Sequence, residues 1–181
     1  MRLYILLTLS LLLLSLPSPN QTIPKHLSIA EGYVGTTEKT GHNDGPEIEK
    51  IIKHGGGAKG ASYCAYFIWT ILDSAQVKLP KVRSGMARGY KTKNSIDAND
   101  VLIGKVKIPP GTLVIWQKGE TIFGHVGVVK KWGKKYGYTV EANTSPNNTG
   151  SQSNGDGIWY KYRSIEPLNY FRIKWFTFVS Y

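Results

Sequence analysis

The pattern of apolar and polar positions changes partway along the chain, from a helical period to a period of two. Between residues 46 and 75, apolar side chains recur three and four positions apart, which predicts two helices. The first begins at Pro46 and ends before Gly55, and the second runs from about Ala61 to Ala75. From Gly104 onward, β-branched and aromatic residues alternate with polar ones between turn residues. This second pattern predicts strands at residues 112–116, 125–132, 136–143, 157–164 and 171–179.

Helices followed by antiparallel strands are typical of an α+β fold. We expect the N-terminal helices to pack on a C-terminal antiparallel sheet of about five to six strands. A short helix or turn is considered at residues 23–33 and a short helix at 84–89, whereas the polar residues 144–157 predict a surface loop. The chain shows no internal repeat, so residues 20–181 are expected to form a single domain.

The first residues have the pattern of an export signal. Arg2 precedes an apolar run at residues 5–16, and prolines and serines follow at 17–19. This run is shorter than the roughly 20 apolar residues that span a bilayer. We therefore expect residues 1–19 to be a signal peptide and the protein to be exported, periplasmic or secreted. An uncleaved membrane anchor is the alternative.

The net charge is +11, from 23 Lys and Arg against 12 Asp and Glu. In an exported protein this charge favours an anionic cell-wall polymer or an envelope surface as partner. The basic residues are scattered, without a phosphate-binding loop or an arginine-rich helix, so a nucleic-acid partner is not expected. We expect the protein to be a monomer.

Cys64 is the only cysteine and lies where the second predicted helix begins, after a glycine-rich loop at residues 55–60. Unpaired N–H groups and the helix dipole at such a position favour the thiolate. Exported domains use cysteines in disulfide pairs, so a single thiol indicates a reactive group. A small buried core residue is the alternative. The glycine-rich loop is expected to leave the thiol open to a substrate.

His125 is the candidate base for this thiol, because it opens an apolar strand. Glu141 and Asn143 end the next predicted strand and share one face. A turn centred near Lys134 places Asn143 opposite His125 and Glu141 on the diagonal. Either side chain could accept the Nδ1 proton of His125, leaving Nε2 for the thiol. A structural histidine is the alternative. The other histidines have simpler explanations. We expect His26 to be solvated, His42 to lie in a flexible surface turn and His54 to lie at the end of a helix.

With these residues the chain resembles the CHAP family, a papain-like group of bacterial cysteine amidases and peptidases. The resemblance covers roughly residues 40–145 and is carried by the segments Ser-Tyr-Cys-Ala-Tyr-Phe at 62–67, Gly-Thr-Leu-Val-Ile-Trp at 111–116, Gly-His-Val-Gly-Val-Val at 124–129 and Val-Glu-Ala-Asn at 140–143. It implies a papain-like fold and four catalytic residues: Cys64, His125, Glu141 and Asn143. Tyr63 stands where tryptophan or proline is frequent in the family. The acidic cluster that binds calcium in some relatives is not recognisable, so we expect no metal and no cofactor.

The resemblance further implies hydrolysis of an amide bond in peptidoglycan. The enzyme would be an N-acetylmuramoyl-L-alanine amidase or a peptidoglycan endopeptidase, with Cys64 as nucleophile. Two alternatives stay open. One is a catalytically silent peptidoglycan-binding protein of the same fold, and the other is an acyltransferase that uses the same thiol.

Overall fold

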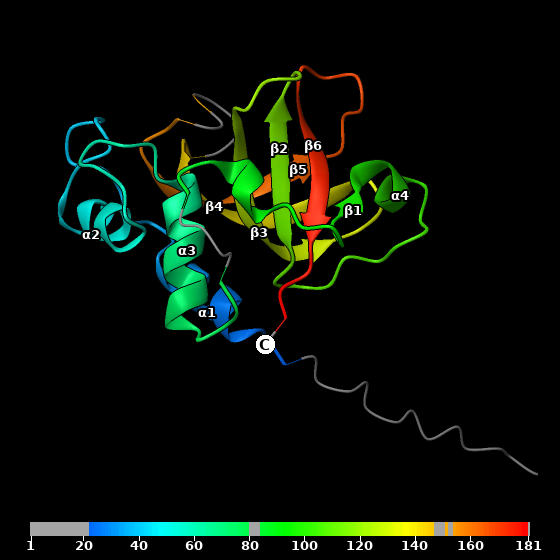
Figure 1. Cartoon of the computed structure of the whole chain (residues 1–181), viewed down its shortest axis with the longest axis horizontal. Coiled ribbons are helices and arrows are strands. Elements are labelled where there is room, and N and C mark those ends of the chain that lie inside the picture. Colours follow the sequence, from blue (N-terminus) through cyan, green and yellow to red (C-terminus); the bar gives the residue numbers. More distant parts are fainter. Residues whose placement is uncertain (1–21, 80–83, 147–150, 152–153, 181) are drawn as a thin grey trace, which may run out of the picture.

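The computed structural model describes residues 22–79, 84–146, 151 and 154–180 (Figure 1). The predicted signal peptide at residues 1–19 lies outside the described residues. In chain order the elements are α1 (Lys25–Gly32), α2 (Pro46–His54), α3 (Cys64–Ser74), the 3-10 helix η1 (Ala87–Tyr90), β1 (Ile96–Asp97), α4 (Ala98–Leu102), β2 (Leu113–Lys118), β3 (Gly124–Trp132), β4 (Tyr136–Thr144), β5 (Gly157–Ser164) and β6 (Phe171–Thr177).

The strands form one antiparallel sheet in the order β1-β6-β2-β3-β4-β5. Figure 1 shows α1, α2 and α3 gathered at one side of this sheet and α4 beside β1 at the other end. The predicted α+β architecture, with N-terminal helices and a sheet of about five to six strands, is therefore confirmed. The arrangement is that of a papain-like fold.

Both predicted helices form, with one difference in their bounds. Helix α2 begins at Pro46 and carries Glu47 and Glu49 in its first turn, where negative charge is favourable. Helix α3 begins at Cys64, three residues later than the pattern indicated. The chain reaches α3 through Gly60, whose φ of 77° is a left-handed conformation that glycine adopts without strain. The later start makes Cys64 the first residue of α3.

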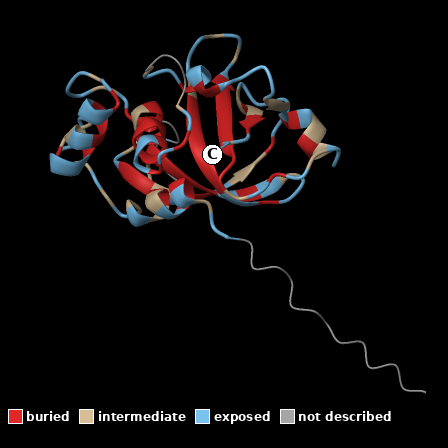
Figure 2. Cartoon of the chain, turned by 60° about the horizontal axis from the view of Figure 1, so that its bottom comes forward, coloured by how far each residue is buried: buried red, intermediate tan, exposed pale blue. Residues whose placement is uncertain are grey.

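Two apolar clusters lie on the two faces of the sheet, and Figure 2 shows their buried residues along the strands and the inner sides of the helices. The larger one joins α1, α2 and α3 to the sheet, with Leu27, Ile51 and Phe67 among its fully buried side chains. The smaller one includes Val101 of α4 and Phe176 of β6. Because α3 is buried along most of its length, its position relative to the sheet is set by packing.

Strand β1 and helix α4 were not predicted from the sequence. They contain two and five residues, which is too short for either period to be visible. The 3-10 helix η1 lies near the short helix considered at residues 84–89. Among the described residues, the structure contains no helix whose length and apolar character would let it span a bilayer.

Candidate active site

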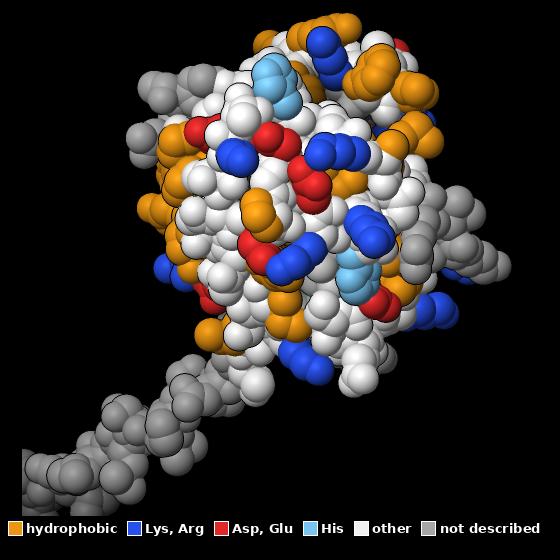
Figure 3. All heavy atoms as spheres, turned by 90° about the vertical axis from the view of Figure 1, so that its left-hand side faces the viewer, with side chains coloured by type: hydrophobic (Ala, Val, Ile, Leu, Met, Phe, Trp, Pro, Cys, Tyr) orange, Lys and Arg blue, Asp and Glu red, His pale blue; other side chains and the backbone are white. Residues whose placement is uncertain are grey.

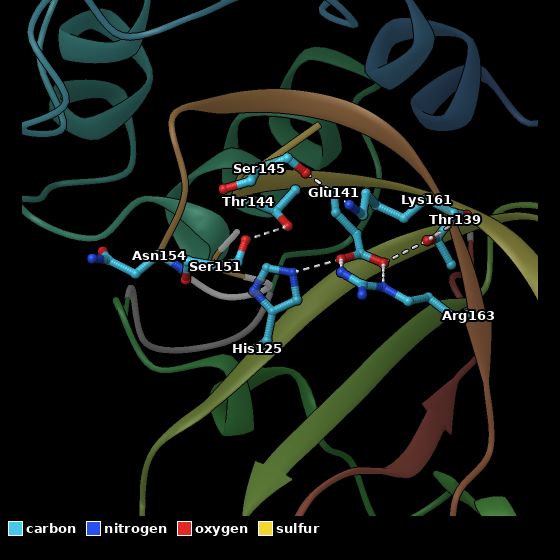
Figure 4. A network of polar contacts seen from close by, with 9 residues as sticks. All are labelled: His125, Thr139, Glu141, Thr144, Ser145, Ser151, Asn154, Lys161 and Arg163. Carbon is cyan, nitrogen blue, oxygen red and sulfur yellow. Dashed lines mark hydrogen bonds and ion pairs between the residues drawn. The ribbon is translucent and has the colours of Figure 1, made fainter. Parts of the chain in front are cut away.

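His125 and Glu141 lie on adjacent strands and form a buried ion pair. Gly127 pairs with Glu141, which makes Glu141 the diagonal neighbour of His125, as the hairpin predicted. His125 Nε2 donates a hydrogen bond to Glu141 Oε2 at 2.9 Å, and both side chains are completely buried (Figure 4). The carboxylate thereby determines which ring nitrogen carries the proton.

The ring nitrogen facing the carboxylate is the opposite of the predicted one. We expected Nδ1 to face the acceptor, whereas Nε2 does so. The diagonal position of Glu141 explains why Nε2 makes this contact. Within the imidazole ring, Nε2 is farther from Cβ than Nδ1 is, so it can reach the diagonal neighbour. Nδ1 is buried and makes no regular hydrogen bond among the described residues, while the Cys64 side chain is close enough to act on the ring. Nδ1 is therefore the nitrogen that remains for the thiol.

The surroundings of His125 favour the charged imidazolium. Burial by itself lowers the pKa of His125, because it removes the ring from water. The neighbouring Cys64 and Glu141 more than offset this and raise the pKa to about 9. At neutral pH the imidazole can therefore hold a proton beside the thiol.

Glu141 is held by a second cation, Arg163 of β5. Arg163 Nε donates to Glu141 Oε1 at 2.8 Å and Nη2 donates to Oε2 at 2.5 Å, a bidentate pair. The Thr139 hydroxyl also donates to Oε1, at 2.5 Å. Burial alone would raise the pKa of Glu141, but Arg163 and then His125 outweigh it and hold this pKa far below its usual range. The carboxylate is therefore ionised.

Asn143 lies at an irregularity near the end of β4. Its φ is 60°, and the register with β5 shifts between Ala142 and Thr144, so Asn143 is the bulged residue. The regular pairing of β3 with β4 starts at Gly127 and Glu141, so the predicted Asn143–His125 pair falls outside this regular ladder. Asn143 is buried, and its backbone carbonyl accepts a hydrogen bond from Gly155 N–H at 2.9 Å.

Cys64 occupies the N-terminus of α3 and is only 5 % exposed. The Tyr90 hydroxyl donates to the Ala65 carbonyl at 2.7 Å and anchors this first turn to η1. Two glycines of the preceding loop pack on Tyr66, since a Cβ at Gly55 or Gly57 would lie 2.5–2.6 Å from its ring. These glycines serve close packing, which differs from the open approach to the thiol that we expected.

Residues 54–143 match the family model of the CHAP domain. The chain belongs to the CHAP-domain family. CHAP domains are broadly peptidoglycan hydrolases, and all four predicted site residues fall inside the matched segment. Comparisons with curated proteins and with solved structures found no match.

Arg163 lies outside the matched CHAP segment, and sequence reasoning missed it. Its only signal was a pair of cations two positions apart, Lys161 and Arg163, on a strand otherwise rich in tyrosine. Lys161 is also buried, and its Nζ donates to the Ser145 carbonyl at 2.7 Å (Figure 4). The alternation places both cations on the face of β5 that meets Thr139 and Glu141.

Two of the other histidines make structural contacts, whereas His42 is exposed. His26, expected to be solvated, is buried, and its Nε2 lies 2.7 Å from the Gly111 carbonyl. Gly111 permits this contact, because a Cβ there would lie 2.9 Å from the ring. His54 pairs with Asp73 at 2.7 Å near the ends of α2 and α3. Within the described residues, no cluster of three or more His, Cys, Asp or Glu is arranged to bind a metal ion.

Proposed function

We propose that this protein is a cysteine hydrolase that cleaves an amide bond in peptidoglycan, as an N-acetylmuramoyl-L-alanine amidase or an endopeptidase. One observation carries the proposal: a buried imidazole, held by an ionised carboxylate, lies beside the single cysteine at a helix N-terminus. A structural histidine would need only one satisfied hydrogen bond. Two cations arranged around one buried carboxylate instead suit a site where charge moves.

In the proposed reaction the Cys64 thiolate attacks the substrate carbonyl carbon. The backbone N–H of Cys64, at the start of α3, is positioned to donate to the oxyanion that develops. The imidazolium of His125 gives its Nδ1 proton to the leaving amine as the C–N bond breaks, which leaves a thioester. Neutral His125 then removes a proton from water, and the hydroxide attacks the thioester and releases the acid and the thiol.

Glu141 holds the ring of His125 in the tautomer that this sequence of steps requires. Its negative charge also stabilises the imidazolium that is present before attack and again during hydrolysis of the thioester. We assign Asn143 to the support of the adjacent backbone, because it forms the bulge near the end of β4, two positions after Glu141. Export after removal of residues 1–19 completes the proposal, and N-terminal sequencing of the mature protein tests it.

The decisive experiment incubates purified peptidoglycan with residues 20–181 and with the Cys64→Ala variant, followed by mass spectrometry of the soluble products. We expect new amine and carboxyl ends only with the parent protein. A free lactyl carboxylate identifies an amidase, and a new end within the peptide identifies an endopeptidase. Products extended by an added amine would identify the acyltransferase.

Two other results would contradict the proposal. Absence of new ends with the parent protein, together with retained binding, favours the silent binding protein. Equal activity of the Cys64→Ala variant contradicts the cysteine mechanism. His125→Gln serves as the second variant, because it keeps a polar side chain that approximates the ring in size and cannot transfer the proton.

A further inference from the structure

Four tyrosines lie together on the surface of β4 and β5. We call them the tyrosine platform, and they are Tyr136, Tyr138, Tyr160 and Tyr162. Tyr138 pairs with Tyr162 across the two strands. Because side chains alternate along a strand, the platform lies on the face opposite to Thr139, Glu141 and Arg163. None of the four tyrosines therefore belongs to the network of His125, Glu141 and Arg163, although the same face of the sheet carries α3 and Cys64.

Three rings of the platform form a continuous aromatic surface, and Tyr160 lies two positions before Tyr162 on the same face of β5. The Tyr136 and Tyr162 rings are stacked, with centroids 5.7 Å apart and planes 6° apart. The Tyr138 and Tyr162 centroids are 5.0 Å apart. Each of the four residues is 43–50 % exposed. Single exposed aromatic residues are ordinary, whereas contiguous ones mark interaction sites.

The cations that contact the platform are paired with acids. Lys130 lies over the Tyr160 ring at 4.5 Å and donates to Glu31 at 2.6 Å. The Tyr160 hydroxyl donates to the same carboxylate at 3.1 Å. Lys135 lies over the Tyr136 ring at 5.3 Å, and its Nζ is 3.7 Å from Glu166. In a chain of net charge +11, the lysines at these rings are thus largely neutralised.

These properties distinguish between three kinds of partner. An anionic polymer would find more attraction at unpaired lysines elsewhere on the surface. A second copy of the chain would gain little, since four half-exposed rings offer on the order of 400 Å², against about 800 Å² per partner in a stable interface. A neutral sugar chain fits best, because a pyranose ring has an apolar C–H face and hydroxyls at its edge. Tyrosine offers the matching flat face and hydroxyl.

We propose that the tyrosine platform binds the glycan strand of peptidoglycan and holds the protein on its substrate. The choice of polymer rests on the proposed function, whereas the binding itself requires no turnover. Because the platform lies on the face of the sheet that also carries α1 and α3, the bound glycan serves as an anchor on the side of the molecule that holds Cys64.

The test measures binding in a Cys64→Ala background, so that it is independent of cleavage. Purified peptidoglycan from which the anionic polymers have been removed serves in sedimentation assays, and a soluble chito-oligosaccharide serves in titrations. We expect the added pair Tyr138→Thr and Tyr162→Thr to weaken both interactions about tenfold. Threonine maintains strand propensity, so the sheet is retained. Tyr170→Thr, at an exposed tyrosine outside the platform, is the matched control and is expected to bind normally.

Four outcomes would overturn the platform proposal. Unchanged binding by the double variant excludes the platform, and equal loss in the Tyr170 control excludes its specificity. Binding that requires the anionic polymers and disappears at roughly 0.5 M salt identifies charge as the determinant. Self-association that only the parent protein shows identifies a second copy as the partner. If the parent protein with Cys64 intact binds through the platform but cleaves nothing, the proposed hydrolase is contradicted and the platform proposal stands.

Discussion

At the scale of residues, the candidate site is a row of neighbouring side chains whose charges alternate in sign. Arg163 holds Glu141, Glu141 holds His125, and His125 lies beside Cys64. Removing two ions from water costs several kcal/mol each, so a buried carboxylate needs its partners. Arg163 touches Glu141 rather than the thiol, which makes it a positioning residue. Its guanidinium is held in turn near the Trp116 ring, 5.6 Å from the centroid.

We expect Arg163→Met to raise the pKa of Glu141, because the bidentate cation that stabilises the carboxylate is lost. The acid limb of the pH–rate profile then moves to higher pH, and kcat/KM falls at least roughly tenfold. Stability should fall by about 3–5 kcal/mol, the usual cost of breaking a buried pair. Arg163→Lys keeps the positive charge but not the bidentate guanidinium, so it should recover part of the lost kcat/KM and part of the lost stability.

Peptidoglycan hydrolysis measured across pH checks this expectation. Arg172→Met is the matched control, because Arg172 donates to the Pro167 carbonyl and does not contact Glu141. An Arg163→Met protein with the parent pH profile would show that Arg163 contributes to folding alone.

At the scale of elements, β3 and β4 bring the acid and the base together, and a glycine makes room for them. Gly127 lies directly opposite Glu141. A Cβ at this position would lie 2.6 Å from Glu141 Cγ and 3.1 Å from the Val140 carbonyl oxygen. The side chain of Glu141 thus crosses the strand over Gly127 on its way to His125. The glycine in this strand is a requirement of the diagonal contact.

Gly127→Ala should therefore displace Glu141 and lengthen its hydrogen bond to His125. We expect the free energy of unfolding to fall by about 1–3 kcal/mol, as in other overpacked sites. The loss of kcat should be larger than in variants whose stability falls by the same amount. Denaturant unfolding and steady-state kinetics measure the two effects. Gly32→Ala is the control, since a Cβ there meets nothing within 4 Å. Equal behaviour of the two variants would contradict the steric role of Gly127.

At the scale of the whole molecule, the sheet connects a helix from the first half of the chain to strands from the second. Cys64 is carried by α3, and His125, Glu141 and Arg163 come from three successive strands of the sheet. The surface charge is distributed differently from this concentrated network. On the face in Figure 3, the Lys and Arg side chains are interspersed with acidic ones and do not gather in one patch.

The charge network should make the free energy of unfolding depend on pH. The folded pKa of His125 is about 9, against about 6.5 in an unfolded chain. Its stabilisation is therefore complete below about pH 6.5 and is lost as the pH rises through about 9. Glu141 has a lowered folded pKa, so its stabilisation is present above about pH 4.3 and is lost as the pH falls below it. The network stabilises most between these limits.

Denaturant unfolding at pH 6 and pH 9.5 checks this expectation. The parent protein should lose roughly 1–3 kcal/mol more between the two pH values than the His125→Gln variant does. The same pH dependence in both proteins would assign the effect to other groups.

The sequence predicted the elements well where a period extends over several residues. Helix α2 and strands β2 to β6 form close to their expected bounds, and the hairpin places Glu141 diagonal to His125 as predicted. Helix α4 and strand β1 were missed because they are shorter than one readable period. Helix α3 begins three residues later than predicted because the chain turns at Gly60, and a turn of this kind is not visible in the spacing of apolar residues.

The sequence by itself determined the order of helices and strands, the one thiol and the histidine beside two candidate acceptors. These follow from local spacing, because periodicity and hairpin register depend on neighbours along the chain. Only the tertiary structure decided that Nε2 meets Glu141, that Asn143 lies at a bulge, and that Arg163 completes the network. Arg163 reaches Glu141 through the pairing of β4 with β5, which are joined by a long polar loop. Contacts across such a loop depend on packing between strands, and no spacing along the chain predicts them.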